Sequence, residues 1–451
     1  MSFITLGQAA QWCGGRVEEK YRDVEFFGAS NDTRNIQPGQ LFLALKGARD
    51  GHEFIPAAIE KGAAAVLCNH CEGDYPAIIV EDVRIALGKI AAAERQRLGC
   101  KVVAITGSVG KSTTKEMVVS VLQTAYKVGK TPVNHNNDIG MPMAILALPA
   151  DTEVAVLEMG MNHFREIAYL ADIAKPDVGV ITNIGVMHIE NLGTVEGIRK
   201  AKLEILEGMS SESKLILNGD DGKLFGYPIE GVQTLYFGIA NESVQVRGKN
   251  VTTTTEGLCF DALCDAGQIP VSLALEGEHF VADALAAVAV GLELGVAPEK
   301  ISAGLGDFRN MEGRQEIFKA GDYTIIKDCY NAGPESMAAA LAVLNQKPGR
   351  HVAVLGDMLE LGACTQAEHY KLGRIVAEQA DVLLAYGPNS VRILNGARTG
   401  GMPDTRARAF TDRERLVDVL KQMAKPGDVI LFKGSRGMRM ELIVDLFLQK
   451  E

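Results

Sequence analysis

The stretch Val102-Val-Ala-Ile-Thr-Gly-Ser-Val-Gly-Lys-Ser-Thr113 runs from an apolar segment through a glycine-rich turn into a helical pattern that extends to about Tyr126. This order is typical of a phosphate-binding loop, because the glycines let backbone N–H groups and the helix N-terminus point at phosphate oxygens. Lys111 is placed to neutralise phosphate charge, and Ser112 to bind Mg²⁺. The spacing is two residues shorter than the usual G-x-x-x-x-G-K-[ST] form. We expect a nucleotide-binding α/β domain around this loop.

Similar apolar runs continue on the C-terminal side of the loop, at Val154–Glu158, Val178–Thr182 and Leu215–Leu217. Helical patterns separate most of them, which is the rhythm of a parallel sheet with crossover helices. The Thr-rich residues 243–275 alternate instead and predict a small antiparallel insert, and a helix is expected over 279–294.

The flanking regions predict two further α/β domains, as the length of 451 residues also suggests. Near the N-terminus, Thr5 and Gln8 fit a capping box, and a helix from Asp82 to Leu98 ends at Gly99. We expect a smaller N-terminal α/β domain (1–98), a central domain with a mostly parallel sheet of the P-loop type (99–316) and a Rossmann-like C-terminal domain (317–451). Other expected strands are 41–45, 64–68, 78–80, 324–327, 352–355, 382–386 and 429–432.

Composition excludes several classes of protein. The 46 Lys and Arg residues against 57 Asp and Glu residues give a net charge of −11, which argues against nucleic acid as a partner. The longest apolar stretch, Ala284–Leu292, is about half as long as a membrane span, and nothing suggests export. The eight cysteines are scattered, and the single C-x-x-C (Cys68, Cys71) lacks a second close pair for zinc. We expect a cytoplasmic monomer with reduced cysteines.

Polar residues follow the predicted central strands, where open α/β sheets bind ligands. Glu158 ends one strand, and a buried carboxylate at that position would suit a metal ion. An ordinary strand-end ion pair is the alternative. His188 follows the next strand and is either a core histidine or a functional one. The Asn-rich string around Asn136 and Asn137 is either a turn or part of the site.

Together these strings resemble the Mur ligase family, the ATP-dependent amide ligases of peptidoglycan precursor synthesis. The central strings are Thr106–Thr113, Glu158-Met-Gly160, Asn183-Ile-Gly185 with His188, and Ala201-Lys-Leu-Glu204. The resemblance covers the whole chain, through the flanking strings Asn31-Asp-Thr-Arg34, Pro38–Phe42, Asp50-Gly-His52, Asp328–Ala332, Leu355–Gly362 and Gly434–Glu441.

The strings of the last domain resemble the branch of the family that adds D-alanyl-D-alanine to UDP-N-acetylmuramoyl-tripeptide. That reaction would use ATP and pass through an acyl phosphate, and it would serve cell-wall synthesis and hence cell shape and division. A diamino-acid-adding ligase and a folylpolyglutamate-type ligase are the alternatives. The Asp-Asn-Pro-Arg-like motif expected of the former is absent from the sequence. A nucleotide-driven switch would not need the first and last domains.

The resemblance also implies roles for individual residues. Lys202 is expected to be carbamylated, although a local interpretation would make it a solvated helix lysine. The catalytic residues would be Lys111, Glu158, His188 and Lys202, and the ligands of Mg²⁺ would be Ser112, Glu158 and His188. ATP would be bound by Gly107, Ser108, Val109, Gly110, Lys111, Ser112, Thr113, His279, Arg314 and Asp328. The substrates would be bound by Asp32, Thr33, Arg34, Lys46, Asp50, His52, Asn136, Asn137, Tyr330, Asn331, Lys433, Ser435 and Arg436.

The chain departs from the family pattern in the helix after the insert. Many relatives carry His-Asn-x-x-Asn where this chain has His279-Phe-Val-Ala-Asp283. The two Asn side chains are expected to contact adenine in those relatives. Phe280 and Asp283 therefore change the predicted contacts to the base but leave the predicted phosphate site intact.

Overall fold

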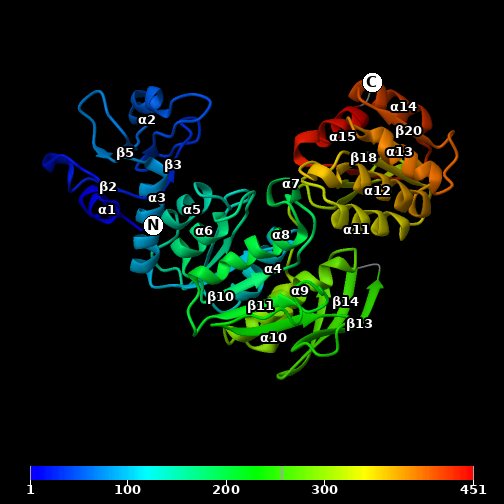
Figure 1. Ribbon diagram of the computed structural model, residues 1–451, viewed down its shortest axis with the longest axis horizontal. Coiled ribbons are helices and arrows are strands. Elements are labelled where there is room, and N and C mark those ends of the chain that lie inside the picture. The colour runs from blue at the N-terminus through cyan, green and yellow to red at the C-terminus, as the bar shows by residue number, and fades with distance from the viewer. Residues whose placement is uncertain (1, 255–256, 450–451) are drawn as a thin grey trace.

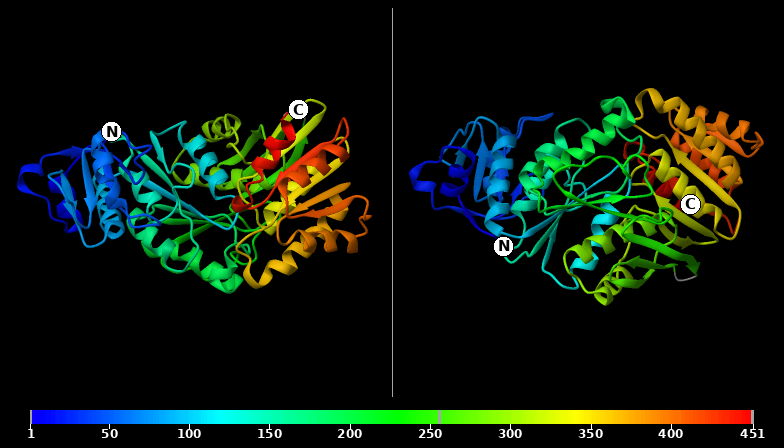
Figure 2. Two further views of the ribbon diagram at one scale, coloured as in Figure 1. Left: turned by 90° about the horizontal axis from the view of Figure 1, so that it is seen from above. Right: turned by 60° about the horizontal axis from the view of Figure 1, so that its bottom comes forward.

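The computed structural model describes residues 2–254 and 257–449. The four-stranded, nine-stranded and six-stranded sheets follow one another along a bent molecule, with the N-terminal part at one end and the C-terminal part at the other (Figure 1). The central part lies between them in both further views (Figure 2). The architecture is the multidomain α/β fold with parallel sheets that the sequence predicts.

The N-terminal part has a parallel four-stranded sheet beside a two-stranded pair. The capping box of Thr5 and Gln8 is present, as predicted. Asp82 caps the long third helix, which ends at Gly99 in the left-handed conformation with φ of 64°. The elements are β1 (Ile4–Thr5), α1 (Leu6–Cys13), β2 (Glu25–Phe26), β3 (Ala29–Ser30), β4 (Leu41–Leu43), α2 (Ile55–Glu60), β5 (Ala65–Cys68), β6 (Ala77–Ile79) and α3 (Val83–Leu98).

The central sheet has nine strands in the order β15-β14-β13-β12-β11-β10-β7-β9-β8. It is parallel from β8 to β13 and antiparallel from β13 to β15. The strands are β7 (Lys101–Thr106), β8 (Val128–Lys130), β9 (Val154–Glu158), β10 (Val178–Ile181), β11 (Lys214–Asn218), β12 (Gln233–Gly238), β13 (Val246–Thr254), β14 (Gly257–Cys264) and β15 (Gly267–Leu273). The expected insert is thus antiparallel, but it extends the main sheet instead of forming a separate unit.

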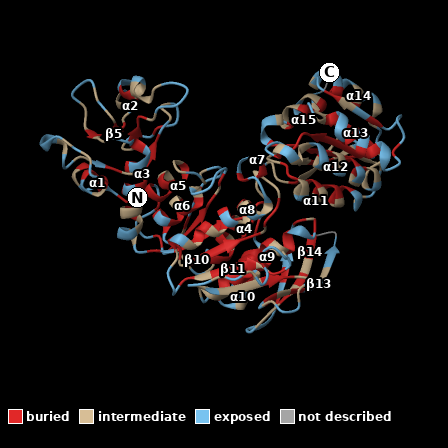
Figure 3. Ribbon diagram, viewed as in Figure 1, coloured by how far each residue is buried: buried red, intermediate tan, exposed pale blue. Residues whose placement is uncertain are grey.

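Helices cover both faces of this sheet, and the sheet separates two hydrophobic cores. Val102 and Ala104 of β7 point into one core, and Val103 and Ile105 into the other. The strands are buried while the outer helix faces are exposed (Figure 3). The helices are α4 (Lys111–Leu122), α5 (Gly140–Leu146), α6 (Glu166–Ala174), α7 (Ile189–Leu192), α8 (Val195–Leu203), α9 (His279–Glu293) and α10 (Pro298–Gly306). Helix α4 ends at Leu122, before the predicted Tyr126.

The C-terminal sheet has the order β16-β17-β21-β18-β19-β20 and is parallel except for the β16–β17 pair. Its elements are β16 (Glu316–Ala320), β17 (Tyr323–Asp328), α11 (Pro334–Asn345), β18 (His351–Gly356), the short η4 (Gly362–Cys364), α12 (Thr365–Gln379), β19 (Val382–Tyr386), α13 (Ser390–Thr399), β20 (Ala407–Phe410), α14 (Arg413–Met423), β21 (Val429–Lys433) and α15 (Glu441–Leu448).

The described residues show neither a disulfide bond nor a membrane-spanning helix. All eight cysteines are free thiols, as predicted. Within residues 2–254 and 257–449, no helix has the length and apolar character of a membrane span.

Candidate active site

A cavity of about 960 Å³ lies where the three parts of the chain meet. Asp82 and Arg84 line it from the N-terminal part, Lys111 and Glu158 from the central part, and Tyr330 from the C-terminal part. The predicted site residues that line it are Ser108, Val109, Gly110, Lys111, Ser112, Thr113, Asn136, Asn137, Glu158, His188, Lys202, His279, Arg314, Asp328, Tyr330, Asn331 and Lys433. The topology thus brings together residues more than 300 positions apart in the sequence.

The glycine-rich loop is held by the turn that follows β10. Asn183 accepts a hydrogen bond from the amide of Val109 (2.9 Å), and its side-chain amide donates to the carbonyl of the same residue (3.0 Å). The amide of Ser108 donates to the backbone carbonyl of Asn183 (3.0 Å). These two loop amides are therefore used internally. The first N–H groups of α4, which have no partner within the helix, are the ones that can bind phosphate.

Two glycines are required by this close packing. Gly107 has φ of 150°, and a Cβ there would lie 1.8 Å from Oγ1 of Thr182. Gly110 has φ of 87°, and a Cβ there would lie 2.5 Å from Oδ1 of Asp283. Gly107 does not itself line the cavity, and it shapes the loop through its close packing against Thr182.

Lys111 begins α4, and its ammonium donates to the carbonyls of Gly107 (2.8 Å) and Ser108 (3.2 Å). Burial lowers the pKa of Lys111, Glu158 opposes that shift and Arg314 adds to it. A cation is thus fixed against the mouth of the glycine-rich loop, where it can neutralise phosphate charge.

Glu158 is buried at the end of β9, with two groups holding its carboxylate. The side-chain amide of Asn136 donates to Oε1 (2.8 Å), and the ammonium of Lys115 lies 3.8 Å from Oε2. Lys115 is itself fully buried and donates to the carbonyl of Thr131 (2.8 Å). Asn136, which could have been only a turn residue, thus contacts a predicted metal ligand.

Lys202 lies at the end of α8, and only 2% of its surface is exposed. Within the described part of the chain, no hydrogen bond or ion pair reaches its amine. Burial lowers the pKa of Lys202 well below its ordinary value, and the neighbouring Lys111 adds to that effect. The shift favours the neutral, nucleophilic form of an amine that lines the cavity.

His188 precedes α7 with φ of 63°, a left-handed conformation that is uncommon for residues other than glycine. Its Nδ1 atom lies 2.6 Å from Oε2 of Glu360, which follows β18 in the C-terminal part. The imidazole lowers the pKa of the Glu360 carboxyl.

Arg314 comes from the segment between α10 and β16 and reaches the glycine-rich loop. Its Nη2 donates to Oγ of Ser112 (2.9 Å), and its guanidinium stacks 4.0 Å from the centre of the Tyr330 ring. The Tyr330 hydroxyl donates to Asn134 of the central part. Tyr330 of the C-terminal part thus packs on the arginine that contacts the phosphate-binding loop.

The end of β17 contributes Asp328, which is paired with the ammonium of Lys433. Lys433 also donates to the carbonyl of Asn331 (3.1 Å). Lys433 is therefore fixed as a structural cation at the cavity wall, with one acidic partner already in place.

The N-terminus of α9 contributes His279 and Asp283. Although His279 has surface open to the cavity, the protein atoms around it lower its pKa to about 4. Burial raises the pKa of Asp283 to about 7, and its Oδ1 accepts a hydrogen bond from Oγ1 of Thr114 (2.8 Å). Phe280 is buried in the central core.

The predicted nucleotide-sugar residues of the first domain do not line this cavity. Asp32 binds the exposed Arg34 through both carboxylate oxygens, and this guanidinium lowers the pKa of Asp32 to about 2. His52 accepts a hydrogen bond from the amide of Asn69 (3.1 Å), and its Nδ1 lies 2.6 Å from Asp50. Thr33 and Lys46 of the same set also lie outside the cavity, as do Ser435 and Arg436 of the C-terminal domain.

The last predicted loop is engaged in contacts within its own domain. Ser435 is buried, donates to the carbonyl of Ala332 (3.2 Å) and accepts from the amide of Leu359 (2.9 Å). Arg436 pairs with Glu441 (3.1 Å), and its side chain is 67% exposed. In this loop, Arg436 presents a largely open guanidinium.

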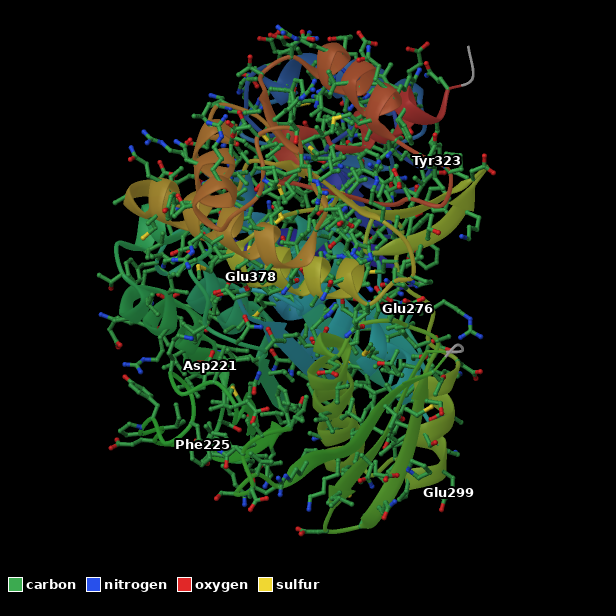
Figure 4. The ribbon with its side chains drawn as sticks, turned by 90° about the vertical axis from the view of Figure 1, so that its right-hand side faces the viewer. Asp221, Phe225, Glu276, Glu299, Tyr323 and Glu378 are labelled. Atoms are coloured by element: carbon green, nitrogen blue, oxygen red, sulfur yellow. The ribbon has the colours of Figure 1, made fainter. Side chains whose placement is uncertain are left out.

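A second contact joins the central and C-terminal parts outside the cavity. Glu276 lies at the junction of the two parts (Figure 4), where its carboxylate pairs with Lys347 of the C-terminal part. Its backbone carbonyl accepts from the side chain of Gln315. These contacts help to fix the domain arrangement that closes the cavity.

The described residues contain no group of three His, Cys, Asp or Glu side chains that could hold a metal by themselves. This agrees with Mg²⁺ chemistry, in which one or two protein carboxylates act together with substrate phosphates. The donors gathered here are the Glu158 carboxylate, the Ser112 hydroxyl and the His188 ring, all at the cavity wall.

Four contributors are missing from the sequence prediction: Lys115, Asn183, Glu335 and Glu360. The first supports Glu158 and the second supports the loop, whereas Glu335 lines the cavity opposite Gly185. Asn183 lies in the string Asn183-Ile-Gly185, which carries the family resemblance, and the sequence therefore contained a signal for its role. Glu360 also lies in such a string (Leu355–Gly362), whereas the contacts of Lys115 depend on tertiary packing and leave no local signal.

Comparisons with known proteins agree over the whole chain. Residues 105–291 match the Mur ligase middle domain, residues 313–436 the Mur ligase glutamate ligase domain, and residues 27–95 the Mur ligase family catalytic domain. The UDP-N-acetylmuramoyl-tripeptide–D-alanyl-D-alanine ligase of Bacillus subtilis (strain 168) is 39% identical over 96% of this chain and 95% of its own length.

Two solved structures are similar over nearly their full lengths. A crystal structure of MurF from Acinetobacter baumannii has a TM-score of 0.90 at 32% identity and covers 100% of both chains. The MurF ligase of Thermotoga maritima, solved in complex with ADP, has a TM-score of 0.83 at 28% identity and covers 94% of this chain and 97% of its own.

Proposed function

The chain belongs to the Mur ligase family, and we propose that it is the ATP-dependent ligase that adds D-alanyl-D-alanine to UDP-N-acetylmuramoyl-tripeptide. The observation that carries this proposal is the single cavity that joins the phosphate-binding loop of one domain to Arg314 and Tyr330 beyond it. Relatives that bear this activity in their names match the chain almost from end to end.

The proposed reaction has two chemical steps. A carboxylate oxygen of the tripeptide attacks the γ-phosphorus of ATP, which gives an acyl phosphate and ADP. The neutral amine of D-alanyl-D-alanine then attacks the acyl carbon, a C–N bond forms, the nitrogen loses one proton to solvent, and inorganic phosphate leaves with the C–O bond electrons. Transfer between two anions requires neutralised charge more than covalent help from the protein. Lys111 and Arg314 supply two cations at the loop.

The residues at the cavity wall fit a Mg²⁺ ion. Ser112, Glu158 and His188 would hold it, and the ion would supply charge neutralisation at the phosphates. The fit rests on a buried carboxylate aimed at the cavity and on a hydroxyl one residue after the loop lysine. Asn136 and Lys115 keep the Glu158 carboxylate in place.

We propose that Lys202 is carbamylated. Its neutral amine would add to CO₂, with loss of one proton to solvent, and the neutral side chain would become an anion. A buried lysine that lacks an acidic partner among the described residues is costly as an ammonium, whereas a carbamate beside Lys111 would be paired.

The substrate ends are proposed to lie in the outer domains, which we place at residues 1–98 and 317–451 around the central domain (99–316). Asp32, Thr33, Arg34, Lys46, Asp50 and His52 would form the uridine-nucleotide site. The exposed Arg436 would meet the dipeptide carboxylate, with Lys433 and Ser435 shaping the loop. The protein would act as a cytoplasmic monomer in peptidoglycan precursor synthesis, and so in cell shape and division.

A competition assay tests the substrate assignment. Purified protein, ATP and Mg²⁺ are incubated with UDP-N-acetylmuramoyl-tripeptide and equal amounts of D-alanyl-D-alanine and a diamino acid, and products are identified by mass spectrometry. We expect the pentapeptide product alone. A second reaction offers UDP-N-acetylmuramoyl-dipeptide with the diamino acid, and a third offers a folate with glutamate. Product in either of these, without pentapeptide in the first, would overturn the proposal.

A further inference from the structure

The contact between His188 and Glu360 joins two domains at the cavity wall. Both residues have φ of 63°, so two residues other than glycine are held in the left-handed conformation where the two parts meet. Such a backbone conformation is unfavourable for residues other than glycine and persists only where its surroundings enforce it. Oε2 of Glu360 lies 2.6 Å from Nδ1 of His188.

Close packing holds the Glu360 segment of the C-terminal part against the His188 segment of the central part. A Cβ at Gly362 would lie 2.9 Å from Cα of Glu190, so the C-terminal segment approaches the His188 segment as closely as glycine allows. Val186 packs against the C-terminal core, and Cys364 packs against the core shared by the first two parts. The Glu360 carboxylate is therefore delivered to His188 by the docked C-terminal domain.

The two ring nitrogens of His188 have different surroundings. Nδ1 is buried and makes no aligned hydrogen bond among the described residues, and the Glu360 carboxylate beside it is in ion-pair contact. The residue also lines the cavity, with 16% of its side chain exposed. Since Nδ1 is covered, Nε2 is the nitrogen that the cavity can reach.

A neutral imidazole carries one N–H and one lone pair. A carboxylate at Nδ1 favours the tautomer with its proton there, which leaves the lone pair on Nε2. Acids that orient metal-binding histidines in this way are common, and their loss typically lowers metal affinity or activity about 10- to 100-fold.

We propose that Glu360 is a positioning residue, which fixes the Nδ1–H tautomer of His188 from the neighbouring domain and presents Nε2 to the cavity. The docked C-terminal domain, which also carries the proposed dipeptide loop, thereby completes the proposed metal site of the central domain. This inference rests on the proposed function only in that the proposed function makes His188 a ligand of Mg²⁺.

The tautomer can be measured without metal, nucleotide or turnover. Full-length protein labelled with ¹⁵N-histidine is examined by two-bond ¹⁵N–¹H correlation at pH 8, and the His188 signal is assigned by its loss in His188→Gln. We expect protonated Nδ1 in the wild type and a shift toward protonated Nε2 in Glu360→Ala. Glu414→Ala is the matched control, because Glu414 is an exposed acid on α14 of the same domain. An unchanged tautomer in Glu360→Ala would overturn the proposal.

A second measurement follows the metal itself. Binding of Mn²⁺ in the presence of a non-hydrolysable ATP analogue is measured by electron paramagnetic resonance. Glu360→Ala should weaken it about 10- to 100-fold, Glu360→Gln should weaken it less because the amide oxygen still accepts from Nδ1–H, and Glu414→Ala should leave it unchanged. Equal affinities in all variants would refute the role. Loss of the ligase proposal would appear instead as a wild type that makes no pentapeptide while its His188 tautomer is as expected.

Discussion

The amine of Lys202 is buried beside the ammonium of Lys111, and both side chains line the same cavity. Burial, and then the repulsion from Lys111, lower the pKa of Lys202 well below its ordinary value and so favour the neutral amine. That form reacts with CO₂, which connects the geometry to the proposed carbamate.

Lys202→Ala should therefore lose most of the ligase activity, by about 100-fold or more. Bicarbonate with a short carboxylate should restore part of it, because a small anion can occupy the space of the missing carbamate. Steady-state rates with and without the additive measure the effect. A variant with an intact rate would exclude the role.

Asn183 should prove necessary for the shape of the glycine-rich loop. Asn183→Ala removes two hydrogen bonds to Val109 and leaves the Val109 amide without its partner, while the Val109 carbonyl still accepts from the Thr182 hydroxyl. We expect a loss of about 1–3 kcal/mol in the free energy of unfolding and weaker ADP binding by titration calorimetry. Asn395→Ala on the distant α13 serves as the control. Unchanged ADP affinity would show that the loop holds its shape without Asn183.

The use of ATP should depend on the planar guanidinium of Arg314, which both donates to Ser112 and stacks on Tyr330. Arg314→Ala should lower kcat/KM for ATP by about 100-fold, and Arg314→Lys should recover only part of it because lysine cannot stack or fork. Initial rates at varied ATP concentration test this. Full recovery in the lysine variant would mean that charge alone is required.

Asp283 should make stability fall as pH rises. Its pKa is about 7 in the folded protein and 3.8 in its ordinary state, so between these values the unfolded chain binds fewer protons. The free energy of unfolding then decreases with pH, and Asp283→Asn, which can still accept from Thr114, removes this dependence. From pH 5 to pH 7 the stability advantage of the variant should grow by about 2–3 kcal/mol, measured by urea unfolding. Asp307→Asn, at an exposed position, should show no such trend. If the free energies of unfolding of Asp283→Asn and wild type differed by the same amount at pH 5 and pH 7, Asp283 would not be protonated in the folded protein.

Local signals predicted most of the fold. The capping box of Thr5, the glycine stop at Gly99 and the apolar strand Val154–Glu158 all lie where the sequence puts them, because each depends on neighbouring residues. The insert was predicted as antiparallel but not as part of the main sheet, since the short connection between β12 and β13 does not predict their parallel pairing.

The site was predictable where it follows strand ends and unpredictable where domains meet. Glu158 and Lys111 lie at the cavity because parallel strands place their carboxyl ends along one edge. Ser435 is tied to Ala332 and Leu359, which no local pattern indicates. Lys115 resembles any helix lysine in sequence, yet packing buries it against Glu158. The assigned ligand roles of these residues stay predictions.

The central claim is that ATP turnover is coupled to a dipeptide acceptor. Phosphate release from ATP is measured with UDP-N-acetylmuramoyl-tripeptide present, first without and then with D-alanyl-D-alanine. The account predicts slow release without the dipeptide, and with it rapid release that matches the pentapeptide formed one for one. Phosphate release at the same rate in both conditions, with no pentapeptide, would contradict it.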